Sequence, residues 1–160
     1  MAARPLAIRL WQRLGGSTLG SWLFTRIVCF KAPYFASISP RVLRLEPGLC
    51  QARLRQRRRV QNHIGTVHAI ALCNLAELCA GLVTDVSIPR DMRWIPQDMT
   101  VRYLKKASGT ITAAARPTTE LRSTEEPYPA TISVALNDDR GQLVASADIH
   151  MWLSPRPPRG

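Results

Sequence analysis

The sequence predicts an α+β protein in which an antiparallel sheet of about five or six strands wraps around one long buried helix. Two observations predict this class. The segment 69–84 is apolar almost without interruption for about four turns, so a helix there must be buried on most sides. Several segments around it alternate apolar and polar residues with the period of half-buried strands, and turn signals separate them. The chain of 160 residues is long enough for one domain with its own core.

The same patterns place the elements along the chain. Strands are expected at 42–45, 50–58, 98–106, 109–116, 129–137 and 142–152. We expect the strands at 98–106 and 109–116 to pair as a hairpin, and the last two strands to pair around a turn at 137–141. The proline-bounded residues 89–97 should form a connection anchored by Trp94, and the polar residues 117–127 an exposed loop.

The N-terminal region has its own character. Residues 1–32 are predicted to be a helical extension, with helices at about 5–14 and 19–30, before a main domain at 33–154 and a flexible tail at 155–160. Residues 1–45 contain basic residues but no Asp or Glu. The favoured interpretation is that the two helices pack on the domain, and contact with anionic lipid is the alternative. A transit peptide for an organelle has a similar composition.

Charge and cysteine content narrow the classes of partner. The net charge of +11 suggests an anionic ligand or surface. However, Arg53, Arg55 and Arg57 alternate with Ala52, Leu54 and Gln56 as one solvated strand face, and basic runs interleaved with aromatic residues are absent. Nucleic acid is therefore not the expected partner. The four cysteines lack the spacing of metal ligands, so we expect reduced thiols and no metal.

A polar loop and a lone carboxylate give the chain its candidate site. The loop 62–68 precedes the apolar helix, in which Asn74, Glu77, Gly81 and Thr84 recur at three- and four-residue spacing. This spacing places the four residues within a stripe roughly 80° wide. A carboxylate within a buried helix is unfavourable unless something pairs with it. We therefore interpret this polar seam as the wall of a cleft that contains Glu77.

The loop, the helix and the strands after them resemble the hot-dog-fold thioesterase superfamily, most closely its PaaI-like acyl-CoA thioesterases. In that group an Asn or Gln precedes a His-Gly-Gly run by six residues, and an acidic residue follows the His by nine. Asn62, His68 and Glu77 match this spacing, and Val101 to Ala115 resembles the strand pair of the family. The resemblance covers residues 41–152, and the chain departs from it where the two glycines are Ala69 and Ile70.

The resemblance implies hydrolysis of acyl-CoA or acyl-carrier thioesters. It assigns Glu77 as the general base or nucleophile, Asn62 as the residue that holds the thioester oxygen or the lytic water, and His68 as the residue that orients the loop. The N–H of Ala69 at the helix N-terminus would polarise the carbonyl. Candidate substrate-binding residues are His63, Gly65, Thr66, Ala69, Gly81, Lys105 and Lys106.

The resemblance also implies the assembly and the surroundings of the site. It implies a homodimer or a dimer of dimers with sites shared between subunits, no metal or organic cofactor apart from the coenzyme A of the substrate, and a bacterial cytoplasmic location. Seven basic residues could form a rim for the phosphates of coenzyme A: Arg57, Arg58, Arg59, Arg90, Arg93, Lys105 and Lys106.

Two other functions remain open at this point. One is a hot-dog protein that binds acyl groups or lipid without turnover. The other is a hydroxyacyl-thioester dehydratase that uses His63 and Glu77, which lie fourteen residues apart. The dehydratases that share this spacing carry Phe-Pro after the His, whereas this chain has Ile64 and Gly65 there.

Overall fold

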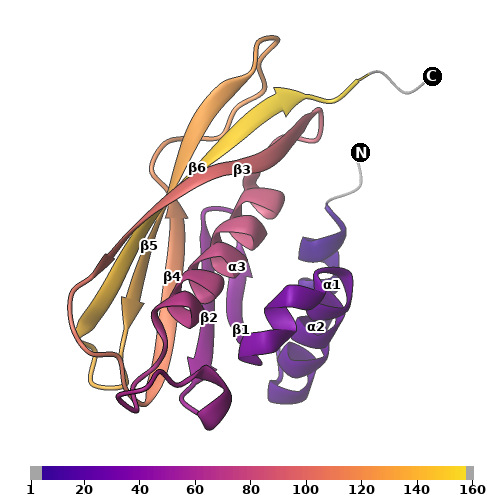
Figure 1. The fold of residues 1–160 in the computed structure, drawn as a ribbon. Coiled ribbons are helices and arrows are strands. Elements are labelled where there is room, and N and C mark those ends of the chain that lie inside the picture. The colour runs from indigo at the N-terminus through magenta and orange to yellow at the C-terminus, as the bar shows by residue number, and fades with distance from the viewer. Residues whose placement is uncertain (1–4, 158–160) are drawn as a thin grey trace.

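The computed structural model of the chain describes residues 5–157. Its helices and strands follow one another in a simple order, with two helices first, two strands, a long helix and four further strands (Figure 1). Their bounds are α1 (Leu6–Leu14), α2 (Thr18–Lys31), the 3-10 turn η1 (Pro33–Ile38), β1 (Arg41–Glu46), β2 (Leu49–Arg55), the 3-10 turn η2 (Arg58–Val60), α3 (Ala69–Ser87), β3 (Met92–Tyr103), β4 (Thr110–Pro117), β5 (Tyr128–Asn137) and β6 (Leu143–Pro155).

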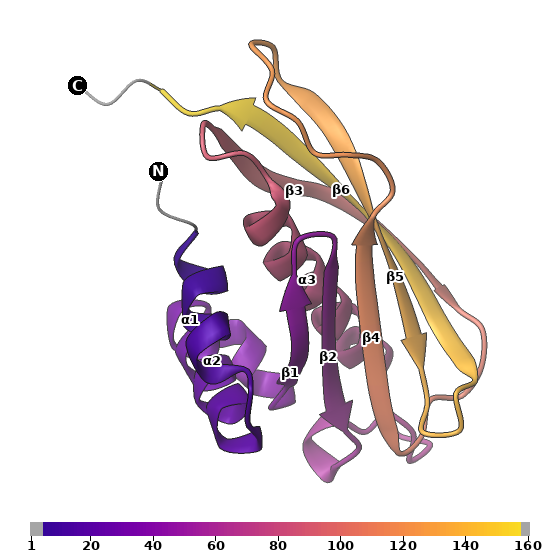
Figure 2. The same cartoon turned by 180° about the vertical axis from the view of Figure 1, so that it is seen from behind.

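The six strands form one antiparallel sheet that curves around α3. The strand order is β1-β2-β4-β5-β6-β3, and every neighbouring pair is antiparallel. Figures 1 and 2 show α3 along the concave side of the sheet, where it packs against the inward-facing residues of β2, β4 and β5. This arrangement is the hot-dog fold, and it confirms the predicted α+β class.

The sequence of α3 explains its position. Its apolar residues surround the helix, so that Leu75, Ala76 and Val83 have no exposed surface. The helix is long and apolar enough to cross a membrane by composition, but most of it is buried inside the protein, as expected for a core helix. It ends at Ser87 because Ile88 precedes Pro89, and a residue before proline favours extended backbone.

The two edges of the sheet differ. At the β1 edge, α2 supplies hydrogen bonds that a further strand would otherwise make: Ser21 Oγ donates to the carbonyl of Val42 at 2.5 Å, and Thr25 Oγ1 accepts from the Val42 N–H at 3.0 Å. At the other edge, β3 pairs only with β6. Within residues 5–157, no further strand pairs with the free side of β3, which therefore presents unpaired backbone groups.

Both N-terminal helices form where the sequence predicts them. Trp11 of α1 packs edge-on against Phe24 of α2, with ring centroids 5.1 Å apart, and Ser17 caps α2 by accepting from the N–H of Gly20 at 3.0 Å. Residues 1–4 of the predicted extension and 158–160 of the predicted tail lie outside the described residues. Arg156 is held to the domain, because its Nε donates to the carbonyl of Met92 at 2.8 Å.

Three local predictions are wrong. Residues 92–97 belong to β3 rather than to a connection, because the strand continues past Pro96 with a bulge in its pairing with β6. The segments predicted as a 98–106/109–116 hairpin lie in different parts of the sheet, since β3 pairs with β6 while β4 pairs with β2 and β5. The strand predicted to reach Arg58 ends at Arg55 and gives way to η2. The hairpin of β5 and β6 is confirmed.

Candidate active site

The loop before α3 is organised by the side chain of Asn62. Its Oδ1 accepts from the backbone N–H of Ile64 at 3.2 Å and of Thr66 at 3.0 Å, and its Nδ2 donates to Thr66 Oγ1 at 2.8 Å. Gly65 completes the turn with φ of +78°, a conformation that favours glycine. One N–H of the Asn62 side-chain amide has no acceptor within the loop. The other polar groups of this side chain stabilise the loop itself, although the residue was predicted to bind the substrate.

The loop ends at His68, the residue immediately before α3. The Nδ1 atom of His68 accepts from the backbone N–H of Ile70 at 3.0 Å, which makes this histidine the N-cap of the helix. Because Nδ1 is the acceptor, the neutral ring carries its proton on Nε2. The N–H of Ala69 has no acceptor among residues 5–157. The helix therefore presents one free donor at its positive end.

A residue that the sequence interpretation did not single out clamps this loop to the rest of the sheet. Gln56 donates from Nε2 to the carbonyl of Gly65 at 2.7 Å and accepts at Oε1 from the N–H of Gly109 at 2.7 Å. The carbonyl of Ala107 accepts from Val67 N–H at 2.8 Å. These bonds tie the loop to the connection between β3 and β4.

Three further candidate residues, Lys105, Lys106 and His63, are exposed at the same end of the molecule as the loop 62–68. Lys105 and Lys106 belong to the connection that the loop is bonded to, and both are exposed. Lys105 Nζ also lies 3.5 Å from Gln142 Oε1. His63 lies at the tip of the loop and is exposed. The structure thus brings the loop residues, His68, Ala69 and the two lysines together.

The residues of the predicted polar seam on α3 differ in burial. Asn74 and Thr84 are buried, with 5% and no exposed surface, whereas Glu77 and Gly81 are half-buried together with Cys73 and Asp85 at four-residue spacing. Of the four residues predicted to form the wall of a cleft, only Glu77 and Gly81 are therefore partly exposed. Both buried side chains are hydrogen-bonded: Asn74 Nδ2 donates to Ser37 Oγ at 3.0 Å, and Thr84 Oγ1 donates to the carbonyl of Ala80 at 2.7 Å.

The half-buried stripe of α3 faces β3. Tyr103 Oη lies 3.0 Å from Cys73 Sγ, and this hydrogen bond together with partial burial raises the pKa of Tyr103 to about 12. At the other end of the stripe, a Cβ placed on Gly81 would lie 3.1 Å from the Trp94 ring. Burial raises the pKa of Asp85, and a hydrogen bond from Trp94 lowers it in part.

Glu77 occupies the middle of this stripe without a partner. Within residues 5–157, its carboxylate forms no ion pair and no side-chain hydrogen bond. Eight residues separate it from Ala69, which corresponds to about 12 Å along a helix. Within one protomer, the carboxylate and the free N–H therefore lie too far apart to contact the two sides of one carbonyl group.

A cavity of about 180 Å³ lies beside the N-terminus of α3. It is bordered by η1, η2 and the first turns of the helix, and its lining includes Tyr34, Arg59, His68 and Asn74. The Oδ1 atom of Asn74 is buried there without a hydrogen-bond donor among the described residues. The cavity gives this end of the protein room for part of a ligand.

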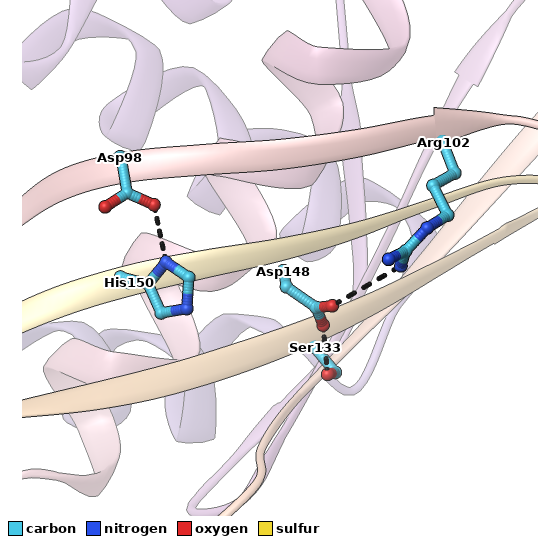
Figure 3. A network of polar contacts seen from close by, with 5 residues as sticks. All are labelled: Asp98, Arg102, Ser133, Asp148 and His150. Atoms are coloured by element: carbon cyan, nitrogen blue, oxygen red, sulfur yellow. Dashed lines mark hydrogen bonds and ion pairs between the residues drawn. The ribbon is translucent and has the colours of Figure 1, made fainter.

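A separate polar network lies on the outer face of the sheet (Figure 3). His150 Nδ1 lies 2.5 Å from Asp98 Oδ1, Ser133 Oγ donates to Asp148 Oδ1 at 2.5 Å, and Arg102 lies 3.9 Å from Asp148 Oδ2. These residues alternate with buried residues of β5 and β6 and with half-buried residues of β3, so they point away from α3. The network is therefore not part of the loop and helix site.

The described residues offer little for a metal ion. Nowhere in residues 5–157 do three or more His, Cys, Asp or Glu side chains lie close enough together to hold one. The four cysteines are free thiols, three of them buried. The chemistry considered below uses the loop, the helix N-terminus and Glu77.

The fold is the hot-dog fold, and its candidate site lies at the loop before α3 and along the half-buried side of that helix. A family model described as Domain of unknown function (DUF4442) matches residues 20–153, and the chain belongs to this family. A sequence comparison with curated proteins gives no match.

Solved structures agree with this placement. The crystal structure of the structural-genomics protein APC5556 is 39% identical, with a TM-score of 0.80 over 94% of this chain and 98% of that chain. PA5026 from Pseudomonas aeruginosa, a probable thioesterase, is 23% identical, with a TM-score of 0.74 over 97% of this chain and all of that chain. The thioesterase SAV0944 from Staphylococcus aureus is 18% identical, with a TM-score of 0.67 over 77% of this chain and 99% of that chain.

Proposed function

We propose that this protein hydrolyses the thioester of an acyl-CoA or acyl-carrier substrate. The observation that carries the proposal is the pair of unused groups on α3: a free backbone donor at Ala69 and an unpaired, half-buried carboxylate at Glu77. Thioester hydrolysis needs a donor that stabilises the oxyanion and a base that activates water. Both are present in a fold shared with proteins named as thioesterases.

The reaction follows from the positions of these groups. The thioester oxygen accepts from the Ala69 N–H, where the helix dipole favours negative charge. The Glu77 carboxylate takes a proton from water as the water oxygen attacks the carbonyl carbon. When the tetrahedral intermediate collapses, the C–S bond breaks and Glu77 returns its proton to the leaving sulfur, which regenerates the carboxylate and releases a free thiol. His68 orients the loop by capping the helix, and Asn62 keeps the loop in shape.

The site would be completed by a second copy of the chain. Because Glu77 and Ala69 lie about 12 Å apart along one helix, a shared carbonyl requires the donor of one protomer and the carboxylate of its partner. The open edge of β3 is suited to an isologous contact, since the β1 edge is already bonded to α2. Ile95 and Tyr103 of β3 are exposed apolar residues at this edge, and a dimer would bury them.

The spacing of residues in a relative supports the assignment. Crystal structures of SAV0944 include variants in which a glutamine and a glutamate fifteen positions apart are each replaced by alanine. Asn62 and Glu77 are also fifteen positions apart in this chain. The exposed Lys105 and Lys106 beside the loop would meet the phosphates of the carrier.

The direct test compares two carboxylates on one helix. We expect Glu77→Gln to lower kcat for thioester release over an acyl-CoA panel by about 10²–10⁴-fold, because the water loses its base. Asp85→Asn is the matched control, since Asp85 lies on the same stripe two turns away, and we expect it to keep the wild-type rate. Equal background rates for wild type and Glu77→Gln, with acyl-CoA still bound, would instead show a binding protein without turnover.

The dehydratase alternative finds no such support. His63 is exposed at the loop tip, and no hydrogen bond joins it to Glu77 among the described residues. The same assay checks this, because a dehydratase would consume a hydroxyacyl thioester without releasing free thiol.

A further inference from the structure

One face of α2 is apolar, exposed and unpartnered. Leu19, Trp22, Leu23 and Phe30 recur at three-, four- and seven-residue spacing, which places them on one side of the helix. Phe30 is 88% exposed and Leu19 is 73% exposed, whereas the opposite side of α2 packs on β1 through buried residues such as Phe24 and Thr25. We call these four residues the α2 stripe. An exposed apolar face of this kind marks an interaction site.

A basic cavity adjoins the α2 stripe. It has a volume of about 310 Å³ and lies between α2, η1 and the outer face of β1 and β2. Five arginines line it: Arg26, Arg41, Arg53, Arg55 and Arg57. Trp22 belongs to both features, since it lies in the α2 stripe and also lines the cavity, and the cavity residue Arg26 follows it by about one turn of α2.

Arg41 is held beside the other arginines of the cavity despite the repulsion between their charges. Arg41 and Arg53 are directly opposite each other on β1 and β2, and like charges in that position are destabilising. Arg41 is fixed in place, because its Nε donates to Ser21 Oγ at 3.3 Å and its terminal nitrogen donates to the carbonyl of Thr18. No acidic residue lines the cavity, and none of the five arginines is in an ion pair among residues 5–157. This arrangement favours an anion.

We propose that this face of the protein binds an anionic lipid surface. The α2 stripe would enter the interface between headgroups and acyl chains, with Trp22 at headgroup level, while a lipid phosphate would enter the arginine cavity. The face lies at the β1 edge of the sheet, at the opposite end from the open β3 edge (Figure 2). A membrane contact at α2 therefore leaves the proposed dimer edge and the α3 site accessible.

The charges distinguish this partner from others. A second copy of the chain pressed on the same face by two-fold symmetry would bring ten arginines together without counterions. A soluble polyphosphate would neutralise the arginines but would leave the α2 stripe in water. An anionic bilayer satisfies both features, and residues 1–45, which contain no Asp or Glu, would not be repelled by it.

The test is co-sedimentation of the full-length protein with phosphatidylglycerol vesicles and with phosphatidylcholine vesicles. We expect binding to the anionic vesicles, weaker binding to the neutral ones and release at high salt. Phe30→Ser should weaken binding by about tenfold or more, and Arg53→Gln and Arg55→Gln by about fivefold each. The matched controls are Leu143→Ser and Arg140→Gln, exposed residues of the β5–β6 hairpin, which should bind as wild type.

The other outcomes each overturn the proposal. A protein that stays in solution with anionic vesicles, or variants of α2 and the cavity that bind as the controls do, would show that this face does not bind lipid. Binding of soluble inositol hexakisphosphate without binding to vesicles would show a site for a free phosphate ligand. A change of mass in light scattering for Phe30→Ser, without vesicle binding by the wild type, would show that the stripe is a subunit contact.

Discussion

The substitution Ala69→Pro removes the proposed oxyanion donor while leaving the helix intact. Proline lacks the backbone N–H, and the first position of a helix is the place where it is best tolerated. The residue before proline must be extended, and His68 already has φ of −64° and ψ of 138°. Since the Ala69 N–H has no acceptor among the described residues, its removal breaks no intramolecular hydrogen bond. We expect the free energy of unfolding to change by less than about 1 kcal/mol.

Activity should respond very differently from stability. Loss of one oxyanion donor costs about 10²–10³-fold in kcat, or roughly 3–4 kcal/mol of transition-state stabilisation. Steady-state thioester release would measure the loss, and thermal unfolding and circular dichroism would establish that α3 is retained. Ala69→Gly is the matched control, because it keeps the N–H. If Ala69→Pro folds normally and retains the wild-type kcat, the carbonyl is not polarised at the helix N-terminus and the mechanism is wrong.

Two further predictions concern the supports of the site. Gln56→Leu removes both hydrogen bonds of the loop clamp, so we expect the free energy of unfolding to fall by about 1–2 kcal/mol and kcat to fall as well. Calorimetry should show a Tm lower by roughly 2–8 °C. An unchanged Tm would contradict the role of Gln56 as a clamp. Burial raises the pKa of Asp85, so the unfolded chain ionises first and ionisation destabilises the folded state as the pH rises above about 4. Asp85→Asn should therefore have a higher Tm than wild type at pH 7, with the difference vanishing below about pH 4; a constant difference would refute the pKa shift.

Local sequence patterns predicted most of the helices and strands, but they did not predict which strands pair in the sheet. The apolarity of 69–84 predicted the buried helix, and the turn at 137–141 predicted the β5–β6 hairpin, because both depend on neighbours in sequence. The pairing of β3 with β6 joins residues about fifty positions apart, and no local signal marks it. Pro96 suggested a connection, yet an edge strand tolerates proline where its N–H would have no partner.

The candidate site was likewise predictable from the sequence only in part. The spacing of Asn62, His68 and Glu77 could be recognised from the sequence, but helical periodicity alone did not show which residues on that side of α3 would be covered. That depends on where the sheet closes: Asn74 is covered by η1, and Glu77 is left beside β3. The clamp of Gln56 joins residues from three segments, which only the folded chain brings together.

The central claim is that each site combines the loop of one protomer with Glu77 of its partner. It is tested most directly by exchanging subunits between the Glu77→Gln and Ala69→Pro proteins, each of which is expected to be nearly inactive alone. A mixed dimer contains one site with both defects and one intact site, so random exchange should restore about a quarter of the wild-type rate of thioester release. If the mixture, verified to contain mixed dimers, stays as inactive as its two parents, the site lies within a single protomer and the claim is contradicted.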